Sequence, residues 1–225
     1  MTGDRPRRLW VIDPSLARAE KQGVGEILDG WTGEHRLFLP ALRPGDGPGR
    51  GSGYETDGVV LMGSMASVMD DLPWLGELGR WLEPIVNGTV RVPLLGICFG
   101  HQLIAHLAGA RVGYLSEDRE KRFGVETSVL DGGGLLPGHH ELRVVVSHRE
   151  EVKECPGAFR VVAERGPIAV DALEHGRLPL FSFQFHPEAR EEFAGHAGIR
   201  ESLIDNRVRE DNRRLLAAFR LRIQG

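Results

Sequence analysis

Hydrophobic and polar positions follow two different patterns along this chain of 225 residues. In the first half, short apolar runs alternate with segments of helical periodicity. Strands are predicted at residues 9–12, 36–39, 59–62 and 92–97, and helices at residues 14–28 and 74–86. Strands that are apolar nearly throughout and joined by helices are typical of a parallel sheet covered on both faces.

After about residue 110 the pattern changes to short strands separated by turns, which favours antiparallel or mixed pairing. These strands are predicted at residues 143–146, 159–163, 168–172 and 180–185. Residues 200–223 then have the spacing of a charged amphipathic helix. A Gly/Pro-rich stretch at residues 44–53 lies inside the alternating region, so we expect a surface loop there rather than a linker.

Together these patterns predict an α/β fold in a single domain that spans residues 1–225. We expect a mostly parallel central sheet flanked by helices, with a smaller mixed or antiparallel β portion.

The composition argues against several classes of protein. A formal net charge of −4 gives no reason to expect a nucleic-acid partner. No apolar run is long enough for a membrane helix, and no signal peptide is recognisable. The two cysteines, Cys98 and Cys155, stand in unlike contexts that suggest no disulfide, so we expect a reducing, cytoplasmic location. No spacing of histidine, cysteine and acidic residues fits a metal site, and no cofactor is predicted.

Residues 96–102, with the sequence Gly-Ile-Cys-Phe-Gly-His-Gln, form the first motif that suggests chemistry. A strand, a sharp turn and a helix, with glycine on both sides of the turn residue, are the setting of a nucleophile elbow. Cys98 would then lie at the positive end of a helix dipole, which stabilises a thiolate. The backbone N–H of Phe99 would point toward a developing oxyanion. The alternative is that Cys98 is an inert buried thiol.

Two polar residues follow Cys98 on the predicted helix. His101 is expected to project away from Cys98 into solvent. Gln102 lies one turn beyond Cys98 on the same face, so we expect it to line a pocket. Cys155, which precedes Pro156 and Gly157, is expected to be a structural or surface thiol.

Residues 181–186 alternate strictly between phenylalanine and polar residues, which places Ser182, Gln184 and His186 on one face of a strand. Pro187 ends that strand. Glu188 then falls on the same side as His186 and could accept a hydrogen bond from its imidazole. A structural histidine is the alternative if this segment is considered alone. Elsewhere, the sequence predicts His139 and His140 in a loop and His106 at an exposed position of a helix.

The two motifs resemble those of the class I glutamine amidotransferases, whose glutaminase domains carry a Cys-His-Glu triad. Residues 71–75 and 147–152 are similar to the stand-alone branch related to the GMP synthetase glutaminase domain. The resemblance implies that Cys98 attacks the side-chain amide of glutamine. It further implies that His186 acts as base and then acid, and that Glu188 orients His186.

The resemblance also implies the remaining site residues. Gly63 and Phe99 would supply the oxyanion donors, and the glutamine would be held by Gly100, Gln102 and the segment Ser147, His148 and Arg149. The chain departs from the family in three places. It has Met62-Gly63-Ser64 where Gly-Gly-Pro is frequent, Glu150 where aspartate is frequent, and no Gly-Trp pair within residues 121–124.

Several functions remain open from the sequence. An α/β-hydrolase with cysteine in the elbow, such as a dienelactone hydrolase, carries its acid before its base, whereas here the base comes first. An amidotransferase-like binding subunit without activity would not need an intact triad. A γ-glutamyl peptide or amide hydrolase would use the same residues without a partner. Since the sequence has no Gly-x-x-x-x-Gly-Lys loop and no fused synthase domain, we predict a glutaminase that supplies ammonia to a separate acceptor-activating subunit.

Overall fold

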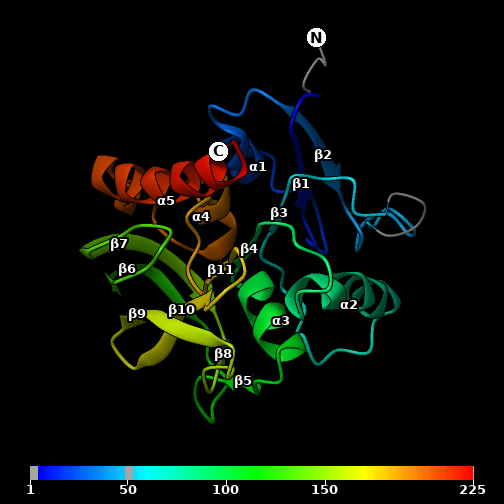
Figure 1. Cartoon of the computed structure of the whole chain (residues 1–225). Helices are drawn as coiled ribbons and strands as arrows, with labels where there is room; N and C mark the ends of the chain where they lie inside the picture. The colour runs from blue at the N-terminus through cyan, green and yellow to red at the C-terminus, as the bar shows by residue number, and fades with distance from the viewer. Residues whose placement is uncertain (1–4, 49–52, 225) are drawn as a thin grey trace.

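A computed structural model describes residues 5–48 and 53–224 (Figure 1). Among these residues, nine strands form one sheet in the order β2-β1-β3-β4-β11-β10-β9-β6-β7. The first five are parallel, and the last four pair antiparallel with one another and with β11. The parallel strands are β1 (Arg8–Ile12), β2 (Glu34–Phe38), β3 (Gly58–Leu61), β4 (Leu94–Ile97) and β11 (Leu180–Phe183).

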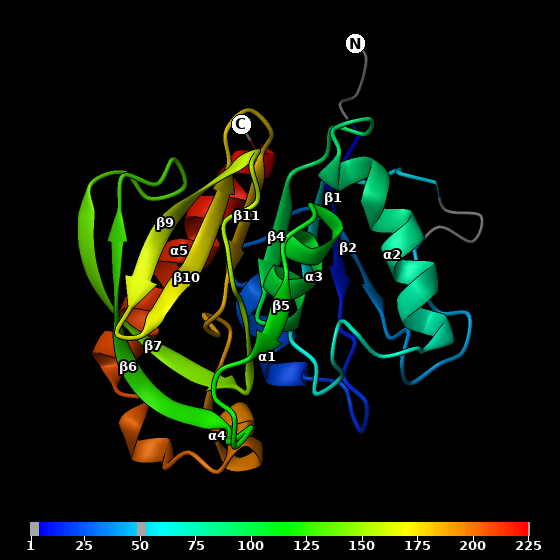
Figure 2. The same cartoon turned by 90° about the horizontal axis from the view of Figure 1, so that it is seen from below.

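The antiparallel part comprises β6 (Arg122–Asp131), β7 (His139–His148), β9 (Phe159–Arg165) and β10 (Ile168–His175). Figure 2 shows these strands on one side of the molecule and β1 to β4 on the other. A second, two-stranded sheet pairs β5 (Val112–Tyr114) with β8 (Glu150–Val152). The predicted α/β fold, with a mostly parallel sheet that continues into an antiparallel portion, is confirmed.

The alternation of side chains along each parallel strand builds two cores, one on each face of the sheet. On β1, Trp10 and Ile12 pack in the core beneath α2 (Pro73–Val86) and α3 (Phe99–Leu107). Leu9 and Val11 pack on the opposite face with α1 (Lys21–Leu28) and α5 (Asn206–Gln224). Because both faces are covered, β1, β3 and β4 are apolar at successive positions, whereas the edge strand β2 begins with three exposed polar residues.

The first predicted helix, at residues 14–28, is wrong in its first half, since α1 begins only at Lys21. The carboxylate of Asp13 accepts hydrogen bonds from the backbone N–H groups of Ser15 and Glu20, at 3.0 and 2.8 Å, and from the Ser15 hydroxyl at 2.5 Å. These bonds hold residues 14–20 as a loop, so the segment satisfies its N–H groups without helical bonds.

The C-terminal helix also starts later than residue 200. A short 3₁₀ turn at Glu201–Leu203 comes first, and α5 begins at Asn206. Asp205 caps it, because its side-chain Oδ1 accepts a hydrogen bond from the N–H of Val208 at 2.9 Å. Three strands, β5, β6 and β8, and the helix α4 (Glu191–Ala197) were not predicted from the sequence. Of the loop predicted at 44–53, residues 49–52 lie outside the described residues.

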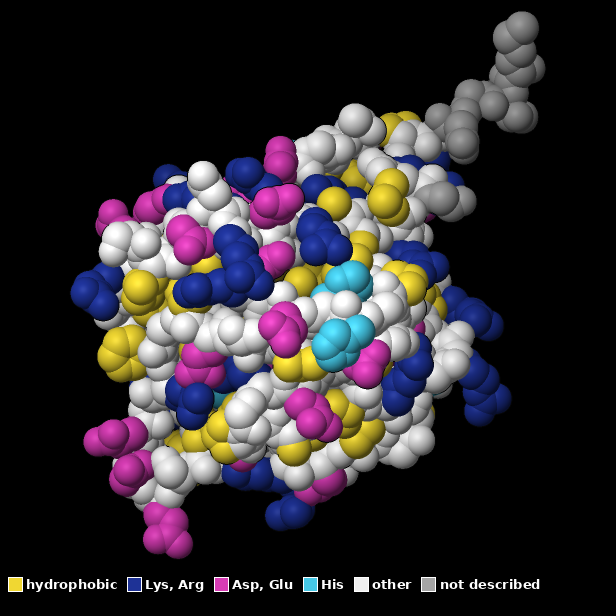
Figure 3. All heavy atoms as spheres, turned by 90° about the vertical axis from the view of Figure 1, so that its left-hand side faces the viewer, with side chains coloured by type: hydrophobic (Ala, Val, Ile, Leu, Met, Phe, Trp, Pro, Cys, Tyr) yellow, Lys and Arg dark blue, Asp and Glu magenta, His cyan; other side chains and the backbone are white. Residues whose placement is uncertain are grey.

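The described residues include no helix with the length and apolar character needed to cross a membrane. Figure 3 shows the left-hand side of Figure 1, where β6, β7 and one end of α5 lie. Basic and acidic side chains are interspersed over this face rather than gathered into a patch of one sign.

Candidate active site

Cys98 occupies a sharp turn between β4 and α3. Its φ of 51° and ψ of −99° lie in a region that residues with a side chain rarely adopt. Glycine is required on both sides of this turn. A Cβ at Gly96 would lie 2.5 Å from Ile104 Cδ1 and 2.7 Å from the Gly100 carbonyl, and a Cβ at Gly100 would collide with the carbonyl oxygen of Leu61. The structure therefore has the strand–turn–helix arrangement that the sequence predicts.

The thiol of Cys98 is buried, with 4% of the residue exposed. Its Sγ lies 3.7 Å from Nε2 of Gln184 and 4.0 Å from the carbonyl oxygen of Ser147. Gln102 is buried in the same region, where its Nε2 donates to Oε1 of Gln184 at 3.2 Å and to the carbonyl of Glu150 at 2.8 Å. The sulfur therefore has an amide N–H on one side and a strand carbonyl on another.

His186 and Glu188 lie where β11 ends, at the same edge of the sheet as Cys98. The Nδ1 atom of His186 is 2.9 Å from Oε1 of Glu188, and both residues are at most 3% exposed. A Cβ at Gly63 would lie 2.8 Å from His186 Cε1 and 3.6 Å from Cys98 Cβ, so Gly63 borders both side chains. Nε2 of His186 has no hydrogen-bond partner among the described residues.

The charges around His186 oppose the effect of its burial. Burial by itself lowers the pKa of a histidine, but the Cys98 thiolate and the Glu188 carboxylate outweigh it and raise the pKa of His186 to about 10. The site therefore favours the protonated, imidazolium form of His186.

Arg190 supports the segment that carries His186, and it was not predicted from the sequence. Its guanidinium is buried and donates from Nη1 to the carbonyls of Ala189 and Pro187, at 2.6 and 3.2 Å. Its Nη2 donates to Oε2 of Glu26 on α1 at 2.7 Å. The segment after β11 is therefore fixed to α1. No local sequence pattern indicates this contact, since Glu26 lies 164 positions before Arg190.

The loop after β3, which begins at Gly63, is held at two points. The hydroxyl of Ser64 donates to the carbonyl of Pro14 at 2.7 Å, and the hydroxyl of Ser67 donates to Oε2 of Glu150 at 2.9 Å. The two departures from the family pattern at Ser64 and Glu150 thus make contacts that fix this loop.

The three residues of the segment 147–149, which was predicted to help hold substrate, lie in different environments. The Ser147 carbonyl faces Cys98. The side chain of His148 is buried and hydrogen-bonds to the Glu150 carbonyl and to Arg165 instead. Arg149 is exposed.

The prediction that His101 is solvated is wrong. His101 is fully buried, and its Nδ1 lies 2.8 Å from the Ser182 hydroxyl, which ties α3 to β11. Burial lowers the pKa of His101 to about 3, so its imidazole is neutral. Every residue in the first turn of α3 is buried, because Gly100 lets the helix approach the sheet closely.

Other histidine predictions also need correction. His106 is partly buried rather than exposed, and His139 and His140 begin β7 rather than lying in a loop. Within the described part of the chain, no group of three or more histidine, cysteine or acidic side chains could hold a metal ion.

Comparison with known proteins agrees with this geometry. The family model for glutamine amidotransferase class-I matches residues 51–206. The glutamine-hydrolysing GMP synthase subunit of Methanopyrus kandleri is 39% identical over 134 residues, which are 59% of this chain and 67% of that protein. The subunit of the same name from Thermococcus kodakarensis is 45% identical over 98 residues, or 43% of this chain and 51% of that protein. The matched stretches therefore span between half and two thirds of these relatives.

Solved structures share the fold over almost the whole chain. The crystal structure of a glutamine amidotransferase from Thermotoga maritima matches with a TM-score of 0.75 at 19% identity, covering 98% of this chain and 99% of that one. A glutamine amidotransferase from Methylobacillus flagellatus gives a TM-score of 0.75 at 19% identity, covering 98% and 95%. Since the family model covers more than half of the chain, this protein belongs to the class-I glutamine amidotransferase family.

Proposed function

We propose that this protein hydrolyses the side-chain amide of glutamine to glutamate and ammonia, with Cys98 as nucleophile, His186 as general base and acid, and Glu188 as its orienting carboxylate. One observation carries this proposal. The cysteine sits in a strained turn at a helix N-terminus, and the buried His186–Glu188 pair lies beside it at the edge of the same sheet.

The reaction begins from the state in which Nε2 of His186 already holds the Cys98 proton, and the Sγ thiolate then attacks the amide carbon. The backbone N–H of Phe99, in the first turn of α3, has no acceptor within the helix and is available to the oxyanion of the tetrahedral intermediate. Gly63 is the second donor. As the intermediate collapses, the C–N bond breaks and His186 gives its proton to the leaving ammonia.

The product on the enzyme is a γ-glutamyl thioester at Cys98. Water attacks its carbonyl carbon, with His186 again accepting a proton, and the C–S bond breaks to release glutamate and the thiolate. Glutamine is held by Gln102, by the close backbone approach at Gly100 and by the backbone of residues 147–149. A reducing cytoplasm keeps the thiol in the usable state.

The ammonia released in this reaction is used by a second protein. The relatives are named as subunits of glutamine-hydrolysing GMP synthases, and this supports a role as the glutaminase subunit of a two-subunit enzyme. Residues 1–225 act as one amidotransferase domain, which is supported by the single sheet that joins the parallel and antiparallel strands. The acceptor that receives the ammonia is activated by a separate subunit.

Steady-state hydrolysis by the purified chain tests this function. Ammonia and glutamate release is measured with glutamine and with a panel of γ-glutamyl amides and peptides, before and after adding an ATP-dependent acceptor-activating subunit. Slow glutamine turnover that rises with the added subunit is the expected result. Fast cleavage of a γ-glutamyl peptide in preference to glutamine, with no effect of the subunit, would identify a γ-glutamyl hydrolase instead. No turnover of any substrate, with intact folding, would identify a binding subunit.

A further inference from the structure

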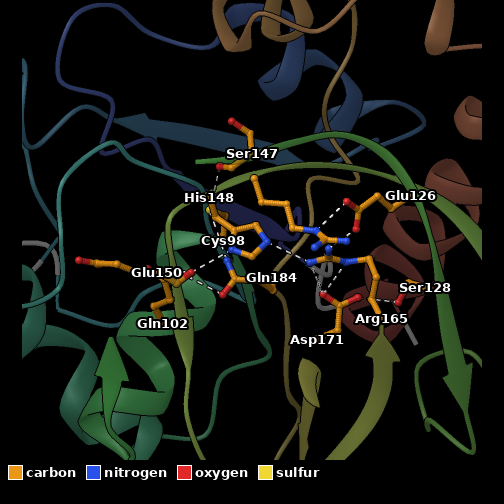
Figure 4. Close-up of polar contacts among 11 residues, drawn as sticks. Cys98, Gln102, Glu126, Ser128, Ser147, His148, Glu150, Arg165, Asp171 and Gln184 are labelled. Atoms are coloured by element: carbon orange, nitrogen blue, oxygen red, sulfur yellow. Dashed lines mark hydrogen bonds and ion pairs between the residues drawn. The ribbon is translucent and has the colours of Figure 1, made fainter. Parts of the chain in front are cut away.

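A buried arginine, Arg165, lies beyond the catalytic residues at the end of β9 (Figure 4). The side chain of Arg165 is 1% exposed, and its Nε and Nη2 both donate to Oδ1 of Asp171, at 3.1 and 2.9 Å. Oδ2 of Asp171 accepts from the Ser128 hydroxyl at 2.6 Å, and Nη1 of Arg165 pairs with Oε2 of Glu126 at 2.5 Å. Burying a guanidinium is costly unless its charge is paired, and here two carboxylates hold it in one orientation.

This orientation leaves an N–H of Arg165 directed at His148. Nη2 lies 3.0 Å from Nε2 of His148. A guanidinium can only donate, so Nε2 must be the unprotonated nitrogen of the imidazole. The proton is therefore on Nδ1, which donates to the Glu150 carbonyl at 3.0 Å. Burial and the charge of Arg165 lower the pKa of His148 to about 3, which keeps the ring neutral.

The same Glu150 carbonyl links His148 to the side chains next to Cys98. It accepts a second hydrogen bond from Nε2 of Gln102 at 2.8 Å, and that nitrogen also donates to Oε1 of Gln184 at 3.2 Å. An amide whose oxygen faces Gln102 must turn its nitrogen the other way. Nε2 of Gln184 accordingly lies 3.7 Å from Sγ of Cys98. If the amide turned around, it would present an oxygen to the thiolate.

We propose that Arg165 is a positioning residue that sets the orientation of the Gln184 amide beside Cys98. It acts through His148, the Glu150 carbonyl and Gln102, and it touches neither substrate nor the sulfur. Without Arg165, Nε2 of His148 is free to carry the proton, and the bond from Nδ1 to the carbonyl is lost. The inference rests on the proposed function only in taking Cys98 as the nucleophile.

The test measures thiolate reactivity without any substrate. The second-order rate of Cys98 alkylation by iodoacetamide is followed over a range of pH, and peptide mass spectrometry separates Cys98 from Cys155. Arg165→Met should slow the reaction between about 10-fold and about 100-fold near neutral pH and move the profile to higher pH. Arg165→Lys keeps the charge without the planar fork, so it should fall between wild type and Arg165→Met.

Two further variants separate positioning from general loss of structure. Arg160→Met removes an exposed arginine on the same strand, which pairs with Glu174, and should leave the alkylation profile unchanged. Gln184→Met should reproduce the slowing, and combining it with Arg165→Lys should add little, because both changes disturb one contact. If circular dichroism shows that Arg165→Met does not fold, the test uses Arg165→Lys, Gln184→Met and the double variant that combines them.

A wild-type alkylation profile in folded Arg165→Met or Arg165→Lys would overturn the inference. Fully additive effects of Arg165→Lys and Gln184→Met would also overturn it. The proposed function is tested separately, by glutamine turnover of the wild-type protein. Absence of glutamine turnover with normal Cys98 alkylation would reject glutamine as substrate and leave the inference on Arg165 standing, whereas an unreactive Cys98 would reject both.

Discussion

Nδ1 of His186 lies 2.9 Å from Oε1 of Glu188, and the two buried side chains are only two residues apart in the sequence. Pro187 and Glu188 form a turn after His186, closed by a hydrogen bond from the Ala189 N–H to the His186 carbonyl at 3.2 Å, and this turn brings the Glu188 carboxylate to the imidazole. The carboxylate therefore fixes the ring so that Nε2 is the nitrogen left for proton transfer. This relationship assigns different tasks to the two residues.

Substitutions of His186 and Glu188 should lower kcat by different amounts. In the proposed mechanism His186→Ala removes the base for the thiol and the acid for ammonia, so we expect kcat to fall about 10²- to 10⁴-fold. Glu188→Gln keeps the imidazole and loses orientation and charge, so its loss should be smaller. Glu201→Gln, at an exposed acidic position, is the control. Steady-state ammonia release measures all three. Equal losses in His186→Ala and Glu188→Gln would show that the roles are assigned wrongly.

The glycine at position 100 should tolerate no side chain. Gly100→Ala places a methyl group against the Leu61 carbonyl, and we expect the free energy of unfolding to fall by at least about 1–3 kcal/mol. Gly25→Ala is the matched control on α1, where an added Cβ meets nothing within 4 Å. It should raise stability by about 0.5–1 kcal/mol, because alanine favours the helix. Chemical denaturation of both variants checks this, and a neutral Gly100→Ala would contradict the packing described at the elbow.

Arg190 and Arg213 both bind Glu26, but only Arg190 also binds the carbonyls beside the His186 segment. Arg190→Met leaves these buried carbonyls without a donor, and we expect about 3–5 kcal/mol of destabilisation and a lower kcat. Arg213 is half exposed, so Arg213→Met should change stability by less than about 1 kcal/mol and leave kcat unchanged. Thermal unfolding and glutaminase assays compare them. Similar effects of the two variants would argue against this supporting role of Arg190.

The buried neutral His101 should make folding sensitive to acid. Its pKa is about 3 in the folded state and near 6.5 in the unfolded chain, so the unfolded state binds the extra proton between these values. The contribution of His101 to the free energy of unfolding is fully present above about pH 6.5. It falls by about 1.4 kcal/mol per pH unit as the pH drops toward 3. His101→Asn has no such proton, so its stability should depend less on pH in this window. Denaturation of both proteins at several pH values measures the slope, and equal slopes would contradict the assignment.

The sequence predicts the centre of the parallel half of the sheet well, because β3 and β4 are buried at every position and apolar throughout, and β1 is apolar after Arg8. The hydrophobic pattern does not predict β6, because its inward side is polar. The side of β6 that faces inward carries Arg122, Glu126 and Ser128. Arg122 and Arg165 both pair with Glu126, and Ser128 donates to Asp171. A buried face made of paired charges does not appear as a hydrophobic pattern, so the strand is not recognised.

In the candidate site, too, locally determined features could be predicted and long-range pairings could not. The elbow around Cys98 and the contact between His186 and Glu188 could be predicted, because the glycine spacing and the short His-Pro-Glu segment are local features. Arg165 and Arg190 were not, because their charges are paired with residues distant in the sequence, and an isolated arginine suggests an exposed position. The loop at residues 14–20 depends likewise on the burial of Asp13, which only the tertiary structure reveals.

The central claim is that Cys98 is the nucleophile that carries the γ-glutamyl group. The most direct measurement treats the purified protein with the glutamine analogue diazo-oxo-norleucine and locates the adduct by peptide mass spectrometry. We predict that Cys98 is labelled, that glutamine protects it, that Cys155 is spared, and that Cys98→Ala has no glutaminase activity. Labelling of Cys155 alone, or full activity in Cys98→Ala, would contradict this claim.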